Sequence, residues 1–190
     1  MIYSHPAMPQ ESVDSEAFRA VMRHVPSPVV VVTAMGETEA RGITIGSFTS
    51  VDLHPPLICF NVGLESQMNG VMDTCDRFCV HILGEAQVHL AEHFAVPDRT
   101  GPEQFEAVPH RQAPDGTPLI DGVTGRLHCI RHEAMNAGNH TIYVGRVVDL
   151  SVVNENGGAV LYYQRSYRGV GNELPSSALS PVKRASSDSS

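Results

Sequence analysis

The sequence predicts a mostly β protein, an antiparallel β-barrel with a few short helices. The 190 residues match the usual length of one domain, so the chain has one core to build. About seven segments show strand patterns, and the two or three helical patterns are short. No repeat of strand and helix is long enough for the crossovers that join parallel strands. Antiparallel strands that curl into a barrel satisfy all three observations.

The N-terminal half alternates strands with two short helices. Asp14 and Ser15 can cap a helix whose apolar residues recur at helical spacing until Pro26 stops it. A second short helix is expected to begin at Ser66, which is a suitable cap. Strand patterns cover residues 29–34, 41–51, 57–62 and 77–83.

The C-terminal half is predicted to be richer in strands. Residues 85–95 are helical by pattern, and five prolines make residues 96–118 a long surface connection. Strand patterns follow at residues 126–132, 140–153 and 159–163. Strict alternation in the second of these would line the barrel core with Ile142, Val144, Val148, Leu150 and Val152.

We divide the chain into a flexible leader over residues 1–14, one domain over residues 15–170 and a disordered tail over residues 171–190. The leader is polar, and the tail contains seven serines, two prolines and no aromatic residue.

Composition and charge exclude several classes of function. Lys and Arg number 13 against 21 Asp and Glu, which gives a formal charge of −8. This acidic balance argues against nucleic acid or an anionic membrane as a partner. The chain has no apolar run long enough to cross a bilayer and no secretory signal, so we expect a cytoplasmic protein. Its four cysteines lack CxxC spacing and are expected to be reduced thiols in or near the core.

Residues 42–56, GITIGSFTSVDLHPP, combine hydroxyl side chains with two glycines in an apolar strand. Small side chains let a ligand approach the backbone, whose N–H groups can bind a planar heteroaromatic ring or a phosphate. An ordinary half-solvated edge strand has a similar composition. The residues alone leave both interpretations open.

Taken with its neighbours, this segment resembles the flavin reductase-like family, the FMN-binding split barrels related to the reductases of two-component monooxygenases. The family pattern is Gly-x-Thr-x-Ser-Ser-x-x-Ser-Val-Ser-x-x-Pro-Pro. It is matched at Gly42, Thr44, Ser47, Ser50, Val51, Pro55 and Pro56. Further blocks resemble family segments in the same order, at residues 57–62, 78–83, 116–129, 138–147 and 162–168. The resemblance spans residues 16–168 and implies a split β-barrel fold.

The resemblance also implies a set of site residues, with FMN or FAD as cofactor and NADH or NADPH as co-substrate. His140 would lie beside the flavin and orient the nicotinamide dinucleotide. The residues implied in flavin binding are Thr44, Ile45, Gly46, Ser47, Phe60, Asn61, Ser66, Gln67, Tyr167 and Arg168. The N-terminus of a helix at Ser66 would suit a phosphate, because its N–H groups are unpaired. A simple helix cap at Ser66, and solvated strand ends at His140, Tyr167 and Arg168, are the alternative interpretations.

Several residues depart from the family pattern. Gly46 replaces Ser or Ala, Gln67 a basic residue, Met68 Thr, His81 Asn and Asn139 Asp. Burying the flavin ring would contribute about 4 to 6 kcal/mol, whereas association costs about 4 to 15 kcal/mol. Stacking alone would therefore not retain the flavin, and we expect it to exchange. The phosphate cation would come from Arg41, Arg77 or a partner subunit.

Residues 89–93 read HLAEH and match a zinc pattern. Helical spacing puts His89 and His93 on the polar face of their helix, and no third ligand follows downstream. We therefore expect no metal.

The sequence thus predicts a flavin reductase that transfers hydride from NAD(P)H to FMN or FAD. By the resemblance it would form a homodimer and could supply reduced flavin to a partner monooxygenase. The alternative is a non-catalytic flavoprotein that stores FMN or carries electrons.

Overall fold

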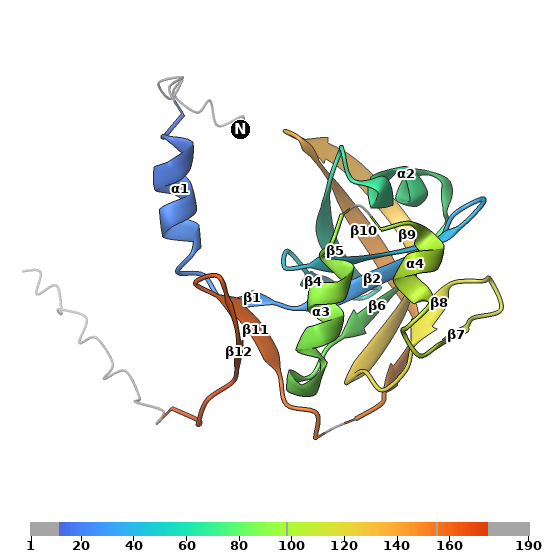
Figure 1. Ribbon diagram of the computed structural model, residues 1–190. Helices are drawn as coiled ribbons and strands as arrows, with labels where there is room; N and C mark the ends of the chain where they lie inside the picture. The colour runs from blue at the N-terminus through green and yellow to red at the C-terminus, as the bar shows by residue number, and fades with distance from the viewer. Residues whose placement is uncertain (1–11, 98, 155, 175–190) are drawn as a thin grey trace, which may run out of the picture.

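A seven-stranded antiparallel sheet dominates the computed structural model, which describes residues 12–97, 99–154 and 156–174 (Figure 1). Its strand order is β3-β2-β6-β9-β10-β5-β4, and every neighbouring pair is antiparallel. The strands are β2 (Val30–Met35), β3 (Ala40–Ile45), β4 (Thr49–Leu53), β5 (Pro56–Gly63), β6 (Arg77–Ile82), β9 (Gly125–Ala137) and β10 (His140–Val152). The mostly β, antiparallel prediction is confirmed. The expected closure is not seen, because no hydrogen-bonded ladder joins β3 to β4 within the described residues.

Two smaller sheets complete the strands. One contains β1 (Ser27–Pro28), β11 (Val160–Tyr163) and β12 (Ser166–Gly169), and the other pairs β7 (His110–Gln112) with β8 (Pro118–Ile120). The predicted strand over residues 41–51 is divided, since the chain leaves β3 at Gly46 and re-enters the sheet as β4 at Thr49. The predicted leader up to residue 11 and the tail from residue 175 lie outside the described residues.

The helices are short, and the first two begin where the sequence predicts caps. They are α1 (Ser15–Met22), α2 (Gln67–Thr74), the 3₁₀ turn η1 (Glu85–Gln87), α3 (Val88–Phe94) and α4 (Gly101–Phe105). Asp14 caps α1, because its Oδ2 accepts from the N–H groups of Glu16 and Ala17 at 3.0 and 2.9 Å. Ser66 caps α2 as predicted. The sequence did not predict α4, which Thr100 caps inside the proline-rich connection.

The run of valines at the start of β2 is buried because both faces of the strand are covered. Val30 and Val32 join the core formed by β5, β6 and α2, whereas Val29 and Val31 join the core beneath α3 and α4. A strand covered on both faces is expected to be continuously apolar. The placement of the cysteines is also confirmed, since all four are free thiols and three of them are buried.

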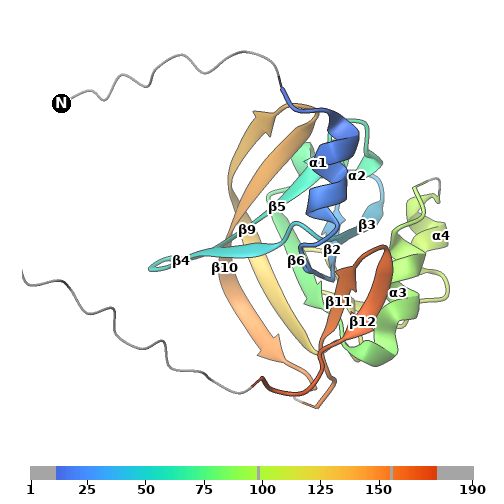
Figure 2. The same cartoon turned by 90° about the vertical axis from the view of Figure 1, so that its left-hand side faces the viewer.

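The core face predicted for β10 is wrong. Thr141, Tyr143 and Gly145 are buried, whereas the predicted face ends in Val148, Leu150 and Val152, which are 43%, 63% and 65% exposed. The register with β9 shifts twice along the strand, and the long β9–β10 hairpin curves along one side of the molecule (Figure 2). The outer half of β10 therefore leaves an apolar strip in solvent.

No helix built from the described residues has the length and apolar character needed to cross a membrane.

Candidate functional site

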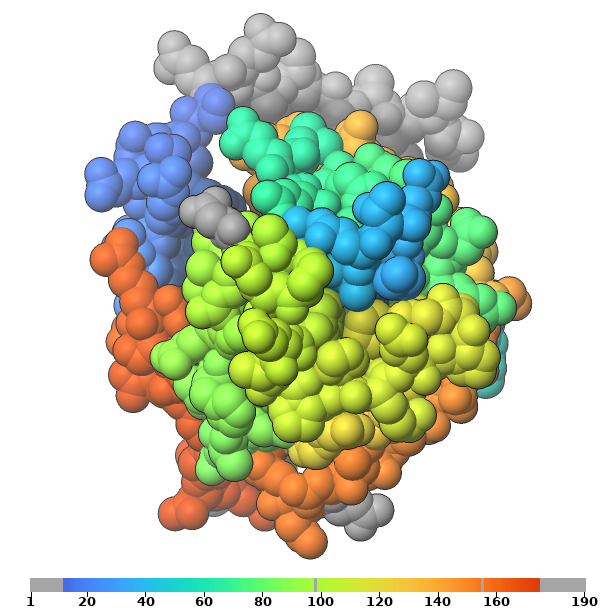
Figure 3. Space-filling view, turned by 45° about the vertical axis from the view of Figure 1, so that its right-hand side comes forward, coloured from blue at the N-terminus to red at the C-terminus, as the bar shows by residue number. Residues whose placement is uncertain are grey.

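A cavity of about 380 Å³ lies where β3, the N-terminus of α2 and the segment after α3 meet. Figure 3 shows the β2–β3 hairpin in blue, α2 in teal and the α3–α4 segment in yellow-green on one face of the molecule. Glu65, Ser66 and Gln67 form one wall, and Arg41 and Ile43 of β3 form another. The structure thus brings two of the predicted residues, Ser66 and Gln67, to a common cavity.

The wall at α2 is a well-formed helix N-terminus. The Ser66 N–H donates to the Gly63 carbonyl at 3.0 Å, and its Oγ accepts from the Met68 N–H at 3.3 Å. The first N–H groups of a helix have no carbonyl partners within the helix, and the helix dipole is positive at this end. The N-terminus of α2 therefore favours an anion, and Glu65, which lines the same wall, is exposed to solvent.

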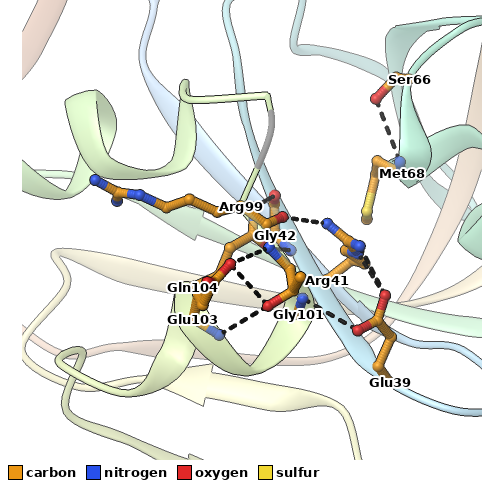
Figure 4. A network of polar contacts seen from close by, with 10 residues as sticks. Glu39, Arg41, Gly42, Ser66, Met68, Arg99, Gly101, Glu103 and Gln104 are labelled. Carbon is orange, nitrogen blue, oxygen red and sulfur yellow. Dashed lines mark hydrogen bonds and ion pairs between the residues drawn. The ribbon is translucent and has the colours of Figure 1, made fainter.

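Arg41 places a cation in the opposite wall. The residue is only 7% exposed, and its Nη2 lies 2.7 Å from Glu39 Oε1 (Figure 4). Its Nη1 donates to the carbonyl of Arg99 at 2.6 Å, and the second oxygen of Glu39 accepts from the Gly101 N–H at 3.1 Å. The other cation considered from the sequence, Arg77, lies on β6 at 3.8 Å from Asp115 and does not line the cavity.

The side-chain amide of Gln104 on α4 forms hydrogen bonds to the backbone of the edge strand β3, as the backbone of a neighbouring strand would. Its Oε1 accepts from the Gly42 N–H at 2.9 Å, and its Nε2 donates to the Gly42 carbonyl at 3.0 Å (Figure 4). A side chain at Gly42 would not fit, because its Cβ would lie 2.6 Å from the ring of Phe94. The two partners are 62 residues apart, and no local pattern could have joined them.

A polar strip lies on the outer face of β5 and β10, and β5 ends at Gly63, three residues before Ser66 of the cavity wall. Asn61 lies opposite Ile142 and Gly63 lies opposite His140 in the antiparallel ladder, so all four side-chain positions share one face. Asn61 and His140 are exposed, and the Asn61 N–H donates to Ser47 Oγ at 2.9 Å. The strip therefore combines the predicted residues Ser47, Asn61 and His140.

The imidazole of His140 is oriented by its neighbour in the chain. Its Nδ1–H donates to Asn139 Oδ1 at 2.8 Å, which leaves Nε2 as the acceptor nitrogen. A Cβ at Gly63 would lie 3.9 Å from Nε2, so this nitrogen lies beside the strip. The Asn139 carbonyl accepts from the Leu64 N–H at 3.0 Å, which fixes the short loop between the strip and Ser66.

The inner face of β10 anchors α2. Tyr143 is fully buried, and its Oη lies 3.0 Å from Asn69 Oδ1 and 3.0 Å from Asp73 Oδ1, both on α2. Burial, and then the hydrogen bond and charge of Asp73, raise the pKa of Tyr143, so the phenol stays protonated and acts as a donor. One strand thus positions both the imidazole of His140 and the helix whose N-terminus opens on the cavity.

Several predicted residues offer no free side chain to this region. Ile45 and Phe60 are packed in the core, and the Thr44 hydroxyl donates to the Ala91 carbonyl at 2.7 Å. Gly46 has no side chain, so all four residues can meet a ligand only through their backbone or, for Thr44, through its hydroxyl oxygen.

Tyr167 and Arg168 lie in the separate sheet on β12. The Tyr167 ring packs edge-on against Tyr162 at 5.2 Å, and the Arg168 guanidinium lies 5.9 Å from the centre of the Tyr163 ring. Neither residue lines the cavity. Within a single copy of the chain, the structure does not bring them to the other predicted residues.

His93 of the zinc-like pattern is engaged in the fold. Its Nε2–H donates to the Gln104 carbonyl at 2.8 Å, and its Nδ1 contacts the guanidinium of Arg99. Across the part of the chain that the structure describes, no three metal-ligating side chains are grouped together.

Comparison with known proteins gives consistent matches. A family model described as flavin reductase like domain matches residues 22–171. A flavin reductase of Pseudomonas putida is 34% identical over 161 residues, which cover 84% of this chain and 92% of that protein. An NADH-dependent FAD reductase of Streptomyces globisporus is 38% identical over 147 residues, which cover 75% of this chain and 80% of that protein.

A third relative is the reductase component of 4-hydroxyphenylacetate 3-monooxygenase from Thermus thermophilus. It is 31% identical over 153 residues, which cover 80% of this chain and 95% of that protein. Among solved structures, the NADH:FAD oxidoreductase SgcE6 of Streptomyces globisporus, in complex with NAD and FAD fragments, superposes with a TM-score of 0.77 at 32% identity. The match covers 89% of this chain and all of that one.

Proposed function

We infer the function of this chain from its family, because it belongs to the flavin reductase like domain family, whose model matches residues 22–171. It is an NAD(P)H:flavin oxidoreductase that transfers hydride from NAD(P)H to FMN or FAD. The match over most of the chain, at 34% identity to a flavin reductase, carries this conclusion.

The residues of the site fit a flavin nucleotide. We propose that the ring lies against the strip of Ser47, Asn61 and Gly63, where Gly63 lets a flat ring approach the backbone. The phosphate end would lie at Ser66 and Gln67, where the helix N-terminus favours an anion. A buried cation in the facing wall and a short loop between strip and cavity support this placement. When bound, the flavin supplies a ring that accepts hydride from nicotinamide.

The chain's own contribution is positioning. Hydride transfer needs no side-chain base, but it needs the two rings held at reacting distance. We assign this role to His140, whose Nε2 is an acceptor directed along the strip because Nδ1–H is held by Asn139. An acceptor at this position can take a hydrogen bond from the carboxamide of the nicotinamide and so orient its ring.

We also propose that the protein works as a homodimer. The apolar strip of Val148, Leu150 and Val152 is exposed, as are Val51 and Leu53 of the edge strand β4. A monomer seldom leaves such surface in water. Sedimentation equilibrium should give twice the monomer mass, and Leu150→Lys should halve it; a wild-type monomer at all concentrations would contradict this proposal.

Reduced flavin produced here would be passed to a partner monooxygenase. The Thermus thermophilus relative is a monooxygenase reductase component, which supports the same role for this chain. We propose a cytoplasmic location, since the four cysteines are free thiols, as is usual in a reducing compartment.

Anaerobic addition of NADH to the protein with one equivalent of FMN, and separately of FAD, tests the function. The expected result is loss of the oxidised flavin absorbance as NADH is consumed one to one. Persistence of the oxidised spectrum, with flavin bound and NADH unchanged, would identify a non-catalytic flavin carrier instead.

A further inference from the structure

We propose that Arg41 supplies the cation for the flavin phosphate, and so determines that this site prefers phosphorylated flavins to riboflavin. The inference rests on the proposed function. In the family pattern a basic residue is common at position 67, where this chain has the uncharged Gln67, and we assign the positive charge to Arg41 instead. This assignment depends on the geometry of the guanidinium in the cavity.

Hydrogen bonds to described residues use only three of the five N–H donors of Arg41. An arginine carries five N–H groups, and the hydrogen bonds of Arg41 within the described residues use one on Nε, one on Nη1 and one on Nη2. Among the acceptors that the structure describes, none pairs with the second N–H on either Nη, although the residue is only 7% exposed and lines the cavity. Two N–H groups of one guanidinium are the donors that bind two oxygens of a phosphate.

The guanidinium is also held in place before a ligand arrives. Glu39 Oε1 accepts from Nε at 3.0 Å and from Nη2 at 2.7 Å, and the Arg99 carbonyl accepts from Nη1 at 2.6 Å. These partners stand on two sides of the group and fix its plane (Figure 4). A phosphate would then meet an ordered cation, and little further side-chain entropy would be lost on binding.

No other cation competes for this role among the described residues that line the cavity, since Arg41 is the one basic residue there. Arg77 is near Asp115 on β6, and the side chain of Arg99 contacts His93. Glu39 offsets part of the charge of Arg41, so the phosphate contribution should be moderate, in keeping with a flavin that exchanges.

A second hollow of about 370 Å³, between the β2–β3 hairpin and α2, shares Arg41 and Gln67 with the cavity as lining residues. This hollow gives the adenosine half of FAD a path beyond the phosphate. We therefore expect the affinities for FMN and FAD to depend on Arg41, whereas the affinity for riboflavin, which has no phosphate, should not.

Titrations of FMN, FAD and riboflavin into wild-type protein, Arg41→Gln and the control Arg77→Gln test this inference. We expect wild-type protein to bind FMN and FAD more tightly than riboflavin. Arg41→Gln should lose about tenfold to a hundredfold in affinity for FMN and FAD, the range typical of a hydrogen bond to a charged group, with riboflavin unchanged within about twofold. Arg77→Gln should match the wild type with all three ligands.

A second variant guards against a folding effect, because Arg41→Gln leaves Glu39 without its partner. The double variant Glu39→Met with Arg41→Met replaces the ion pair by apolar side chains and leaves no lone charge. It should also lose the preference for FMN while keeping riboflavin. The proposal is overturned if either variant that retains riboflavin binding still prefers FMN as the wild type does, or if both variants lose riboflavin together with FMN. Reduction of riboflavin by NADH with wild-type protein tests the proposed function separately, because riboflavin does not use Arg41.

Discussion

His81 is buried completely at the point where β2, β6 and β8 meet. Its Nδ1–H donates to the Val31 carbonyl at 3.1 Å, and its Nε2 accepts from the Ile120 N–H at 3.0 Å. Both ring nitrogens therefore form hydrogen bonds when the ring is neutral, and a proton on Nε2 would break the hydrogen bond from the Ile120 N–H. Burial lowers the pKa of His81 from 6.5 to about 3.

This depressed pKa makes stability depend on pH. Below pH 6.5 the unfolded chain takes up a proton at His81 that the folded chain does not, so the unfolded state gains stability as the pH falls toward 3. At pH 5 the difference of 1.5 pH units from the unfolded pKa corresponds to about 2 kcal/mol in the free energy of unfolding. At pH 7 this loss in the free energy of unfolding is close to zero.

The variant His81→Asn isolates this contribution. Asparagine can donate to the Val31 carbonyl from the place of Nδ1, and it cannot take up a proton in this range, although it leaves the Ile120 N–H without its partner. Urea unfolding at pH 7 and at pH 5 should show that the wild type loses about 2 kcal/mol more than His81→Asn between the two conditions. Any loss in the free energy of unfolding caused by the smaller side chain is the same at both pH values, so it cancels when the two pH values are compared. Equal losses in the two proteins would refute the reasoning.

Three further predictions concern the site and its support. Gln104→Ala should destabilise the protein by about 2 to 4 kcal/mol in urea unfolding, because it leaves the buried N–H and carbonyl of Gly42 unpaired; a change near that of the exposed control Gln112→Ala would contradict the role assigned to Gln104. His140→Ala should slow anaerobic flavin reduction by NADH at least about tenfold, with the FMN dissociation constant nearly unchanged; weaker binding with an unchanged rate for bound flavin would show that His140 serves binding instead. Burial raises the pKa of the thiols of Cys79 and Cys129 to about 12, so both should resist a thiol reagent at pH 8 until urea is added; rapid reaction of either in the native protein would contradict their placement.

Local signals in the sequence predicted the elements that local physics determines. The cap at Ser66 and the strand over residues 29–34 are predicted correctly, because a capping hydroxyl and an apolar run act within a few residues. The core face of β10 was read incorrectly. Strict alternation ignores the shifts in register with β9, and it assumes a core beneath the whole strand, whereas Leu150 lies beyond that core.

The site was predictable only in part, because contacts between distant segments of the chain bring its residues together. Ser47, Asn61 and His140 were proposed from a family resemblance, and they share a strip because β5 pairs with β10 in one register. Arg41 remained one of several candidate cations in the sequence. Its place in the cavity depends on α2 and on the segment after α3, and the packing of these distant segments leaves no mark on the residues around position 41.

A crystal structure of the protein with FMN is the decisive experiment, because one ligand must reach both the polar strip and the cavity. We expect the ring against Asn61 and Gly63 within reach of His140, and the phosphate between the N-terminus of α2 and Arg41. An FMN bound elsewhere, or one whose phosphate points away from the cavity into solvent, would contradict this expectation.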